Sequence, residues 1–498
     1  MQINPNSPNN IHTSILYLND LHAQTPYMAQ LKSETDTFEL TNKDKKDVDS
    51  FILSGGDNFI GHSKDKNKVV SSFLNVSKVE YSAMGNHEVD SMETLPDNLN
   101  NTNTKFIVSN MKKSGNTPFD KFIDDGKIVS STIAEKNGHK YGLIGAAPFK
   151  LNKSKNLSKA NLNVDEYEKT KENIQFEVKK LQDQGVDKII MLSHIGYAYD
   201  LALANEVSGI DIIVGGHSHD LVEGTKNGKN IITAPDGNPV VILQAGQNGE
   251  YIGKLDITFD QAGKVIEATN NVKKTKDSPK NLVVKFFQDR LLGKSEQIGT
   301  ITRVDEMKED PKVTESPYAN FFGDAMVNEL DADIALINSA GIRGKLQKGK
   351  MTSLDVENLI PFENKLVKVE ISEKQIINTL KEGALSVNDN MLKPGIMQVS
   401  GLKYTIDEKG NVKDVQFKDK KGNLTPLNSE NPSDDKKFIA IADDFLISSY
   451  EYPTLNSTKV IERYDFCKEK VAKDYAKKLD PNDIQIKIDG RIQKESRT

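Results

Sequence analysis

The sequence predicts an α/β fold spread over more than one domain, and three observations lead to this prediction. Short apolar blocks typical of β-strands alternate with longer polar or amphipathic stretches along the whole chain. Six blocks in the first half end directly in polar or glycine-rich loops, as the strands of an open sheet do. With 498 residues, the chain fits two large domains or about three of average size.

The first half contains one clear helix pattern besides the six predicted strands. The helix is predicted near Val164–Gln184, with Gly185 as its natural stop. One face of this helix carries the apolar residues Tyr167, Ile174, Val178 and Leu181. The strands are predicted at residues 14–18, 51–53, 79–83, 188–192, 210–214 and 240–243.

A change of pattern places the domain boundary. A predicted strand, Lys254–Phe259, is followed by the polar run Asn270–Lys280 and by a helical stretch, Asn281–Lys294. We therefore expect a first domain at residues 13–265, a linker with a helix at 266–296, and a smaller α/β domain at 297–488.

The second half has its own set of predicted elements. Ser372-Glu373-Lys374-Gln375 is a capping box that should open a helix running through Leu380. Glu408-Lys409-Gly410-Asn411 is typical of a hairpin turn. A further helix is predicted at 318–329, and strands at 334–337, 366–371, 402–406, 412–417 and 438–442.

Composition excludes several classes of protein. Lys and Arg number 66 and Asp and Glu number 72, so the net charge is −6, which argues against a binder of nucleic-acid polymers or anionic membranes. The single cysteine, Cys467, excludes an internal disulfide and a Cys-built zinc site. No apolar run approaches the roughly 18 residues of a membrane span. The first 14 residues lack the pattern of a signal peptide, so the localisation stays open.

Potential metal ligands follow five of the six predicted strands. The carboxyl ends of such strands can bring these side chains to one crevice. Mixed imidazole and carboxylate ligands suit Zn²⁺, Mn²⁺ or Fe, and seven ligands suit two ions about 3.5–4 Å apart that share one carboxylate. Each motif alone has an ordinary structural interpretation, so the prediction depends on their conjunction. The motifs are Asn19-Asp20-Leu21-His22, Gly55-Gly56-Asp57, Gly85-Asn86-His87-Glu88-Val89-Asp90, Ser193-His194 and Gly216-His217-Ser218-His219.

Together these motifs resemble the signature of the calcineurin-like metallophosphoesterases. In the second half, Ile337-Asn338-Ser339-Ala340-Gly341-Ile342-Arg343 resembles the substrate loop of the bacterial 5′-nucleotidase / UDP-sugar hydrolase family. Ile360-Pro361-Phe362 and Asp444-Phe445-Leu446 resemble its two base-stacking segments. The resemblance covers about residues 13–485. It implies an αββα-type sandwich followed by a smaller α/β 5′-nucleotidase C-terminal domain.

The resemblance also implies roles for the residues of the first domain. Asp20, His22, Asp57 and His219 would hold the first divalent metal ion, Zn, Mn or similar. Asp57, Asn86, His194 and His217 would hold the second, so that Asp57 bridges the two. His87 would act on the phosphoryl group, with Asp90 orienting its ring, and water activated by the ions would be the nucleophile.

In the second domain the resemblance implies a substrate site. Asn338 and Arg343 would bind polar groups of the substrate in the loop that contains Gly341, and Phe362 and Phe445 would enclose a nucleobase. Two departures from the family pattern affect this site. Thr314 stands where relatives have an arginine, so one anionic contact is either missing or supplied elsewhere. Ser449-Tyr450-Glu451-Tyr452 replaces a glycine-rich stretch, and Glu451 could take the place of its aspartate.

We therefore predict a dinuclear-metal phosphohydrolase that releases phosphate from nucleotides, most simply a 5′-nucleotidase. The alternatives within the class are a 2′,3′-cyclic-nucleotide phosphodiesterase and a UDP-sugar hydrolase, and hydrolysis of a sulfur-linked ester is a more distant one. An alternative of another class is a catalytically impaired nucleotide- or metal-binding protein. The partner would be a small phosphoester, and the oligomeric state is not predicted. The family is usually periplasmic or extracellular.

Overall fold

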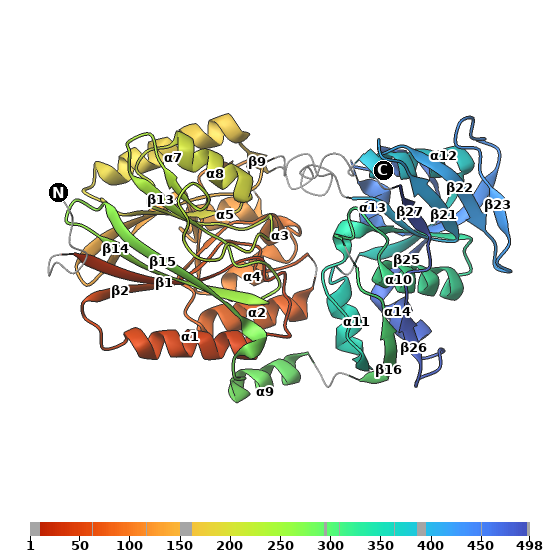
Figure 1. Cartoon of the computed structure of the whole chain (residues 1–498), viewed down its shortest axis with the longest axis horizontal. Helices are drawn as coiled ribbons and strands as arrows, with labels where there is room; N and C mark the ends of the chain where they lie inside the picture. The colour runs from red at the N-terminus through yellow and green to blue at the C-terminus, as the bar shows by residue number, and fades with distance from the viewer. Residues whose placement is uncertain are drawn as a thin grey trace. The chain divides into compact units, whose positions relative to one another are not determined.

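The computed structural model describes residues 10–61, 63–115, 117–149, 162–292, 296–307, 309–362, 364–385, 395–449 and 451–495. The chain divides into two compact units, Met1–Gly293 and Lys294–Thr498, and each is described by itself (Figure 1). Both units mix helices and strands, which confirms the predicted α/β class. None of the helices in the described ranges combines the length and apolarity that crossing a bilayer requires.

The first unit contains two large sheets and the helices that cover them. Its helices are α1 (Met28–Asn42), α2 (Lys64–Val76), α3 (Asn86–Val89), α4 (Leu95–Asn100), α5 (Pro118–Asp124), α7 (Tyr167–Gln182), α8 (Tyr197–Glu206) and α9 (Leu282–Leu291). A seven-stranded sheet has the order β15 (Val265–Lys274), β14 (Tyr251–Phe259), β1 (Ile11–Leu18), β2 (Val48–Ser54), β3 (Tyr81–Ala83), β4 (Lys105–Ile107) and β6 (Ile128–Val129). A six-stranded sheet has the order β12 (Ile231–Thr233), β13 (Pro239–Leu243), β11 (Ile212–Val214), β10 (Ile189–Ser193), β8 (His139–Ala146) and β7 (Ser131–Lys136). Two short strands, β5 (Met111–Lys112) and β9 (Asn163–Val164), form a separate pair.

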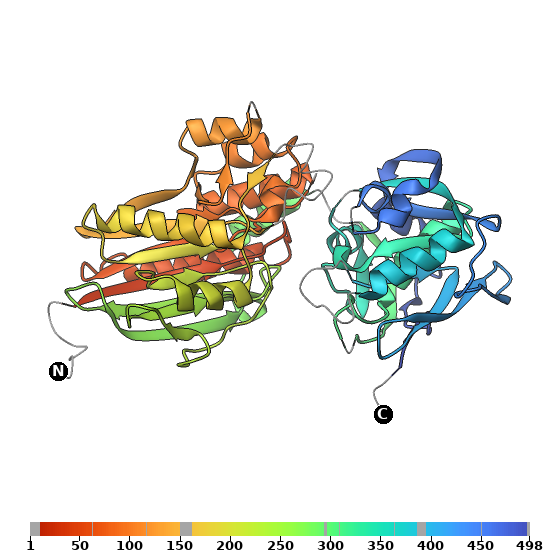
Figure 2. The ribbon, with the colours of Figure 1, turned by 90° about the horizontal axis from the view of Figure 1, so that it is seen from above.

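The two sheets pack face to face and enclose the main core of the first unit. Tyr17 and Phe51 of the first sheet and Leu192 and Leu243 of the second belong to this core, and all four are fully buried. A second cluster lies between the six-stranded sheet and helices α7 and α8. Figure 1 shows α7 and α8 on one side of the strands and α1 and α2 on the other, and Figure 2 looks from the side of α7 and α8. The unit is thus the predicted αββα sandwich.

The apolar residues predicted for one face of helix α7 are the ones that the structure buries. Ile174, Val178 and Leu181 are buried against the six-stranded sheet, and Tyr167 is half-buried at the start of the helix. The chain turns after the helix at Gly185, which has a φ of 75°. A positive φ is easy for glycine and strained for other residues, so this residue ends the helix as predicted.

Residues 266–274 are a strand, where the sequence predicted the beginning of the linker. They lie in β15, which pairs antiparallel with β14 along its whole length. One side of β15 is exposed and polar, because it is the edge strand of the sheet. The polar side chains of an edge strand therefore gave the pattern of a linker.

The second unit contains three smaller sheets around two cores. The five-stranded sheet has the order β20 (Met397–Ser400), β17 (Ile334–Asn338), β24 (Lys437–Asp443), β19 (Lys365–Ser372) and β25 (Lys459–Cys467). The three-stranded sheet has the order β18 (Gly349–Thr352), β16 (Gln297–Val304) and β26 (Ile484–Ile486). The four-stranded sheet has the order β23 (Leu424–Pro426), β22 (Val412–Lys418), β21 (Leu402–Ile406) and β27 (Ile492–Lys494). The helices are α10 (Pro317–Glu329), α11 (Ser353–Leu359), α12 (Glu373–Ala384), α13 (Asp444–Ser448) and α14 (Lys468–Ala476).

Two local predictions for this unit are confirmed. Ser372 caps α12 by accepting a hydrogen bond from the backbone N–H of Gln375, whose side chain accepts one from the N–H of Ser372. Strands β21 and β22 form the predicted antiparallel hairpin. Both signals are short-range, because the residues that make them lie within a few positions of each other in the chain.

Candidate metal centre

The predicted metal ligands lie in loops that follow five strands of the first unit. Asp20 and His22 follow β1, Asp57 follows β2, and Asn86 and His87 begin α3 directly after β3. His194 follows β10, and His217 and His219 follow β11. Strands β1, β2 and β3 are mutually parallel, and so are β10 and β11. The ligands therefore lie at the carboxyl ends of parallel strands, where ligand groups are expected in an open sheet.

The backbone is strained at most of these ligands. A positive φ costs a non-glycine residue on the order of 1–3 kcal/mol, and such residues cluster at functional sites. The loops after β1 and β2 support one another here, because Asp20 N–H donates to Gly56 O at 2.9 Å and His22 N–H donates to Asp57 O at 2.9 Å. The ligands with positive φ are Asp20 (51°), His22 (48°), Asp57 (50°), His217 (78°) and His219 (61°).

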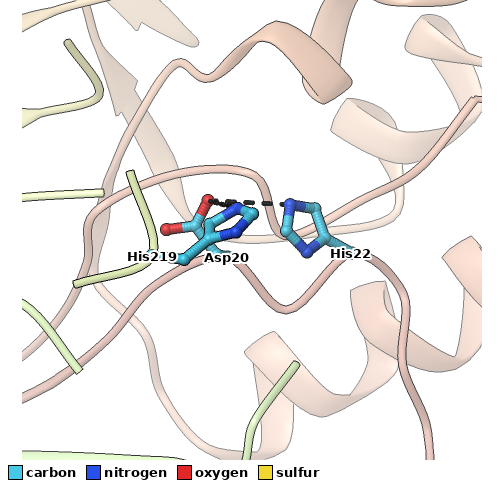
Figure 3. Close-up of side chains that lie close together, drawn as sticks. All are labelled: Asp20, His22 and His219. Atoms are coloured by element: carbon cyan, nitrogen blue, oxygen red, sulfur yellow. Dashed lines mark ion pairs between the residues drawn. The ribbon is translucent and has the colours of Figure 1, made fainter. Parts of the chain in front are cut away.

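One group of ligands gathers around the carboxylate of Asp20. Its Oδ1 lies 3.3 Å from Nε2 of His219 and 3.6 Å from Nε2 of His22, and Figure 3 shows the two rings turned toward this oxygen. Asp20 and His22 are fully buried, whereas His219 is half-buried. One ligand atom from each of the three residues fits within 4.8 Å, which is close enough for all three to bind one cation.

A second group gathers around the carboxylate of Asp57. Its Oδ2 lies 2.9 Å from Nε2 of His194 and 3.5 Å from Nε2 of His22. His217 completes a possible ligand set with Asp57 and His194, and its Nδ1 lies 3.0 Å from Oδ1 of Asn86. Asp57 Oδ2 thus lies within 3.5 Å of one histidine from each group, His22 and His194.

The electrostatics of the cluster suit a divalent cation. Burial by itself would raise the pKa of Asp57, but His194 and His87 hold it well below the usual value of a carboxyl group. Burial would lower the pKa of His194, but Asp57 and Asp20 raise it to about 10. The carboxylates thus depend on positive charge beside them, which a bound cation also supplies.

His194 provides a direct test of this fit. Its Nε2 is buried and makes no hydrogen bond of acceptable geometry within the part of the chain that the structure describes. The same atom nevertheless lies 2.9 Å from Asp57 Oδ2 and 3.7 Å from Asp20 Oδ1. Its other nitrogen, Nδ1, donates to the carbonyl oxygen of Gly55 at 2.6 Å, so a metal ion that displaced the Nε2 proton would find the ring already oriented.

Several supporting residues were missed by the sequence prediction. Glu88 is buried and accepts hydrogen bonds from the backbone N–H groups of Asp57 (3.0 Å), Asn58 (2.7 Å) and Gly85 (2.8 Å), so it ties two ligand loops together. Asn19 donates to Asp20 Oδ2 at 2.7 Å. Both residues stand inside the predicted motifs, so their proximity in sequence to the ligands was the available signal. Such outer contacts orient ligands and tune their affinity for the metal.

Two further supporting residues carried no usable signal in the sequence. Asn248 lies 226 positions after His22, and its Oδ1 is 3.2 Å from His22 Nδ1. Asp200 is buried in α8, where it accepts a hydrogen bond from the hydroxyl of Ser193, the residue before His194. Burial raises the pKa of Asp200 to about 7. Only the fold brings these residues to the cluster.

Glycine is required where the ligand loops meet. A Cβ atom on Gly85 would lie 2.0 Å from Oδ1 of Asp57. A Cβ atom on Gly216 would lie 2.6 Å from the carbonyl oxygen of Gly55 and 2.7 Å from Nδ1 of His194. These glycines let the loops approach closely enough for their side chains to converge.

His87 lies at the edge of the same cluster. Its Nδ1 pairs with a carboxylate oxygen of Asp90, three residues later, as predicted. Its Nε2 lies 3.9 Å from Asp57 Oδ2, and its backbone N–H donates to Asp57 Oδ1 at 2.8 Å. The distances also allow His87 as a ligand together with His22 and Asp57. The Asp90 contact orients the ring and is compatible with either role.

The predicted substrate residues of the second unit lie on separate loops. Asn338 ends β17, and its Oδ1 accepts a hydrogen bond from the N–H of Ala340 at 3.0 Å, so part of its side chain shapes the loop around Gly341. The guanidinium of Arg343 lies over the ring of Phe362, 5.5 Å from its centroid. Phe445 is half-buried in α13. The structure thus brings Arg343 and Phe362 together.

The divergent stretch after α13 has a structural anchor. Tyr452 is fully buried, and its hydroxyl donates to the carbonyl oxygen of Gly395 at 2.7 Å. Glu451 is half-buried beside it, while Tyr450 lies outside the described residues. A buried tyrosine therefore holds this loop, where the family pattern has glycines.

Lys312 lies near the predicted substrate residues, two positions before Thr314. Its carbonyl oxygen accepts a hydrogen bond from Ile396 N–H at 2.9 Å. The surrounding protein and the charge of Arg343 lower the pKa of Lys312, although its side chain is exposed, whereas Asp310 and Glu451 oppose this shift. The sequence left open where a second cation might come from, and the structure places this lysine within electrostatic range of Arg343.

Comparisons with known proteins agree with this site and fold. Residues 13–221 match the calcineurin-like phosphoesterase family, and residues 297–448 match the 5′-nucleotidase C-terminal domain family. The chain is 29% identical over 344 residues to the trifunctional nucleotide phosphoesterase protein YfkN of Bacillus subtilis, a match that covers 64% of this chain and 22% of that protein. It is 29% identical over 356 residues to a 5′-nucleotidase of Mus musculus, with 64% of this chain and 60% of that protein covered. The chain thus spans less than two thirds of the length of either relative.

A solved structure shows the same fold. The 5′-nucleotidase precursor of Thermus thermophilus superposes with a TM-score of 0.81 at 24% identity, covering 98% of this chain and 100% of that one. The first unit, with its Asp/His cluster, has the features of the calcineurin-like phosphoesterase class that its residues match. With its second unit, the chain thus combines two regions that match the calcineurin-like phosphoesterase and 5′-nucleotidase C-terminal domain families.

Proposed function

We propose that the chain releases phosphate from nucleoside 5′-monophosphates with two divalent metal ions. The observation that carries this proposal is the convergence of two ligand groups on Asp57. Asp20, His22, Asp57 and His219 would hold one ion, and Asp57, Asn86, His194 and His217 the other. Bound ions of this kind lower the pKa of water toward 7 and neutralise charge on phosphoryl oxygens.

The chain's own residues would then position the reacting groups. Glu88 keeps the loops of Asp57 and Gly85 together, and Asn248 orients His22. His87 would hold a proton on Nε2 and donate it as a hydrogen bond toward the phosphoryl or leaving-group oxygen. Asp90 would stabilise the charged ring that this requires.

The nucleotide part of the proposal depends on the second unit. The stacked pair of Arg343 and Phe362 combines a cation with an aromatic face, which suits a substrate that carries both phosphate and a base. Lys312 would supply the second cation that the family pattern places at Thr314. A substrate panel tests the proposal by phosphate release. It should include AMP, 2′,3′-cyclic AMP, UDP-glucose and a simple aryl phosphate, and AMP should give the highest kcat/KM.

Removing an aromatic ring should distinguish nucleotides from simpler substrates. Phe362→Ala and Phe445→Ala should each raise KM for AMP by roughly ten- to a hundredfold, because stacking one base is worth about 1–3 kcal/mol. An aryl phosphate without a base should be hydrolysed almost normally, because it needs only the metal centre. Steady-state kinetics on both substrates measure this split.

A matched control separates stacking from folding. Phe417 is also partly buried in the second unit, but it packs against the other core cluster. Phe417→Ala should leave KM for AMP unchanged. Equal losses on AMP and aryl phosphate in Phe362→Ala would identify this ring as a core residue and remove the support for a base site.

Replacing Lys312 by glutamine should weaken binding of the nucleotide phosphate. A charge-assisted hydrogen bond is worth about 1.5–3 kcal/mol, so KM for AMP should rise roughly ten- to a hundredfold with kcat little changed. The exposed Lys348 offers a control, and Lys348→Gln should have no effect. An unchanged KM in Lys312→Gln would mean that Arg343 alone meets the anionic group.

A further inference from the structure

Helix α9 is fixed to the first unit by its polar residues. Asn281 caps the helix, its N–H donates to Ala29 O at 2.9 Å, and its side-chain amide donates to Asp36 at 2.9 Å. Gln288 is buried, and its amide donates to the carbonyl oxygen of Thr25 at 3.0 Å. The helix packs on α1 and α2, at the lower edge of the first unit in Figure 1. The side of α9 that faces the protein is therefore held by the hydrogen bonds of Asn281 and Gln288, with Val284 half-buried beside them.

The opposite side of α9 is apolar and exposed. At 100° per residue, the exposed residues lie across the helix from Gln288, and Arg290 falls in the middle of their face. The two phenyl rings contact each other edge to face, with centroids 5.7 Å apart. The exposed fractions are 77% for Leu282, 64% for Val283, 61% for Phe286 and 56% for Phe287. Such an exposed apolar face is unusual, because the apolar stripe of a surface helix normally faces the core.

Positive charge surrounds this apolar face. Six basic and two acidic residues lie between Lys273 and Arg290, although the chain as a whole carries a net charge of −6. Lys273 and Lys285 pair with Glu34 and Asp289. The other four basic residues are exposed and form no ion pair with any residue in the described ranges: Lys274, Lys276, Lys280 and Arg290.

We propose that this face of α9 binds the surface of an anionic phospholipid bilayer. Exposed aliphatic and phenyl side chains flanked by Lys and Arg are the pattern of an interfacial helix. The net charge of −6 argues against attraction of the whole surface to such a membrane, but the cations beside α9 act locally, because charges more than about 8–10 Å away are screened at physiological salt.

A second copy of the chain is a poorer occupant. Two copies meeting through α9 would bring their unpaired cations together. The footprint is also small, since a ten-residue helix about 15 Å long and 10 Å wide covers roughly 150 Å², against about 800 Å² per partner in a standard interface. A lipid surface has no minimum area and offers the complementary charge.

A tryptophan probe tests insertion directly, because the chain contains no tryptophan of its own. The emission of Phe286→Trp should shift to the blue on addition of vesicles that mix phosphatidylglycerol with phosphatidylcholine. It should not shift with phosphatidylcholine alone or in high salt. Phe176 on α7 is also an exposed phenylalanine, 65% accessible, and Phe176→Trp should show no shift with any vesicle.

Vesicle co-sedimentation of the full chain completes the test. Phe286→Ser combined with Phe287→Ser should weaken binding to the anionic vesicles by about tenfold or more. Lys280→Gln combined with Arg290→Gln should weaken it similarly, and hydrolysis of aryl phosphate should stay unchanged in both variants. Three results would overturn the proposal: no binding of the unaltered chain, equal binding by the serine variant, or a concentration-dependent dimer that the serine substitutions abolish.

Discussion

Replacing Asp57 by asparagine should remove both metal ions and abolish most of the activity. Asp57 faces His22 in one ligand group and His194 in the other, so a neutral amide there leaves two dications with less negative charge between them. Metal ions contribute several kcal/mol to such reactions, and the loss of kcat/KM should therefore be about 10³-fold or more. Elemental analysis of the purified variant and phosphate release measure the two effects.

A buried carboxylate outside the cluster provides the control for Asp57. Asp49 is equally buried, and it accepts hydrogen bonds from Tyr141 (2.6 Å) and Asn137 (2.8 Å) at the start of β2. Asp49→Asn should lose some stability but keep its metal ions. Two ions retained in Asp57→Asn with full activity would disprove the bridging role.

His87→Ala should lower kcat by roughly 10²–10³ while leaving the metal content near that of the unaltered chain. This is the usual effect of removing one donor that stabilises charge in a transition state. The expectation rests on the pairing of His87 with Asp90, which positions the ring but is not needed to hold an ion. Metal analysis beside steady-state kinetics distinguishes the two roles that the geometry allows.

A second histidine–aspartate pair makes this test specific. His139 contacts Asp49, with Nδ1 and Oδ2 2.8 Å apart, and the pair lies at the start of β8 rather than at the carboxyl ends of the strands. His139→Ala should keep both its metal ions and its kcat. If His87→Ala loses an ion instead, His87 is a ligand and the charge-stabilising role is wrong.

The metal centre was predictable because its signals are local in the sequence. Each predicted strand is a short apolar block, and each ligand follows its block within a few residues. The rule that ligands gather at the carboxyl ends of parallel strands then connects them. Asn248 was missed although it follows the sixth predicted strand within a few residues, because no ligand motif marks its loop.

The second unit was harder to predict at the level of its site. Arg343 and Phe362 were named from the resemblance, and the structure places the guanidinium over the ring. Tyr452 was noted only as part of the divergent stretch, and the structure shows it to be a core residue whose hydroxyl donates to the carbonyl oxygen of Gly395. Residue type does not reveal whether a tyrosine faces substrate or core, since both environments accept an aromatic ring with a polar end.

The sequence by itself determined the α/β class, the positions of the strands that precede the ligand loops and the residues that could hold metal ions, because these follow from patterns a few residues long. Only the tertiary structure decided that Glu88 joins two ligand loops, that β15 is an edge strand, and that α9 turns its apolar side outward. These features depend on which face of an element meets the rest of the chain. Periodicity can show that a helix has two faces, but packing alone selects the one that is buried.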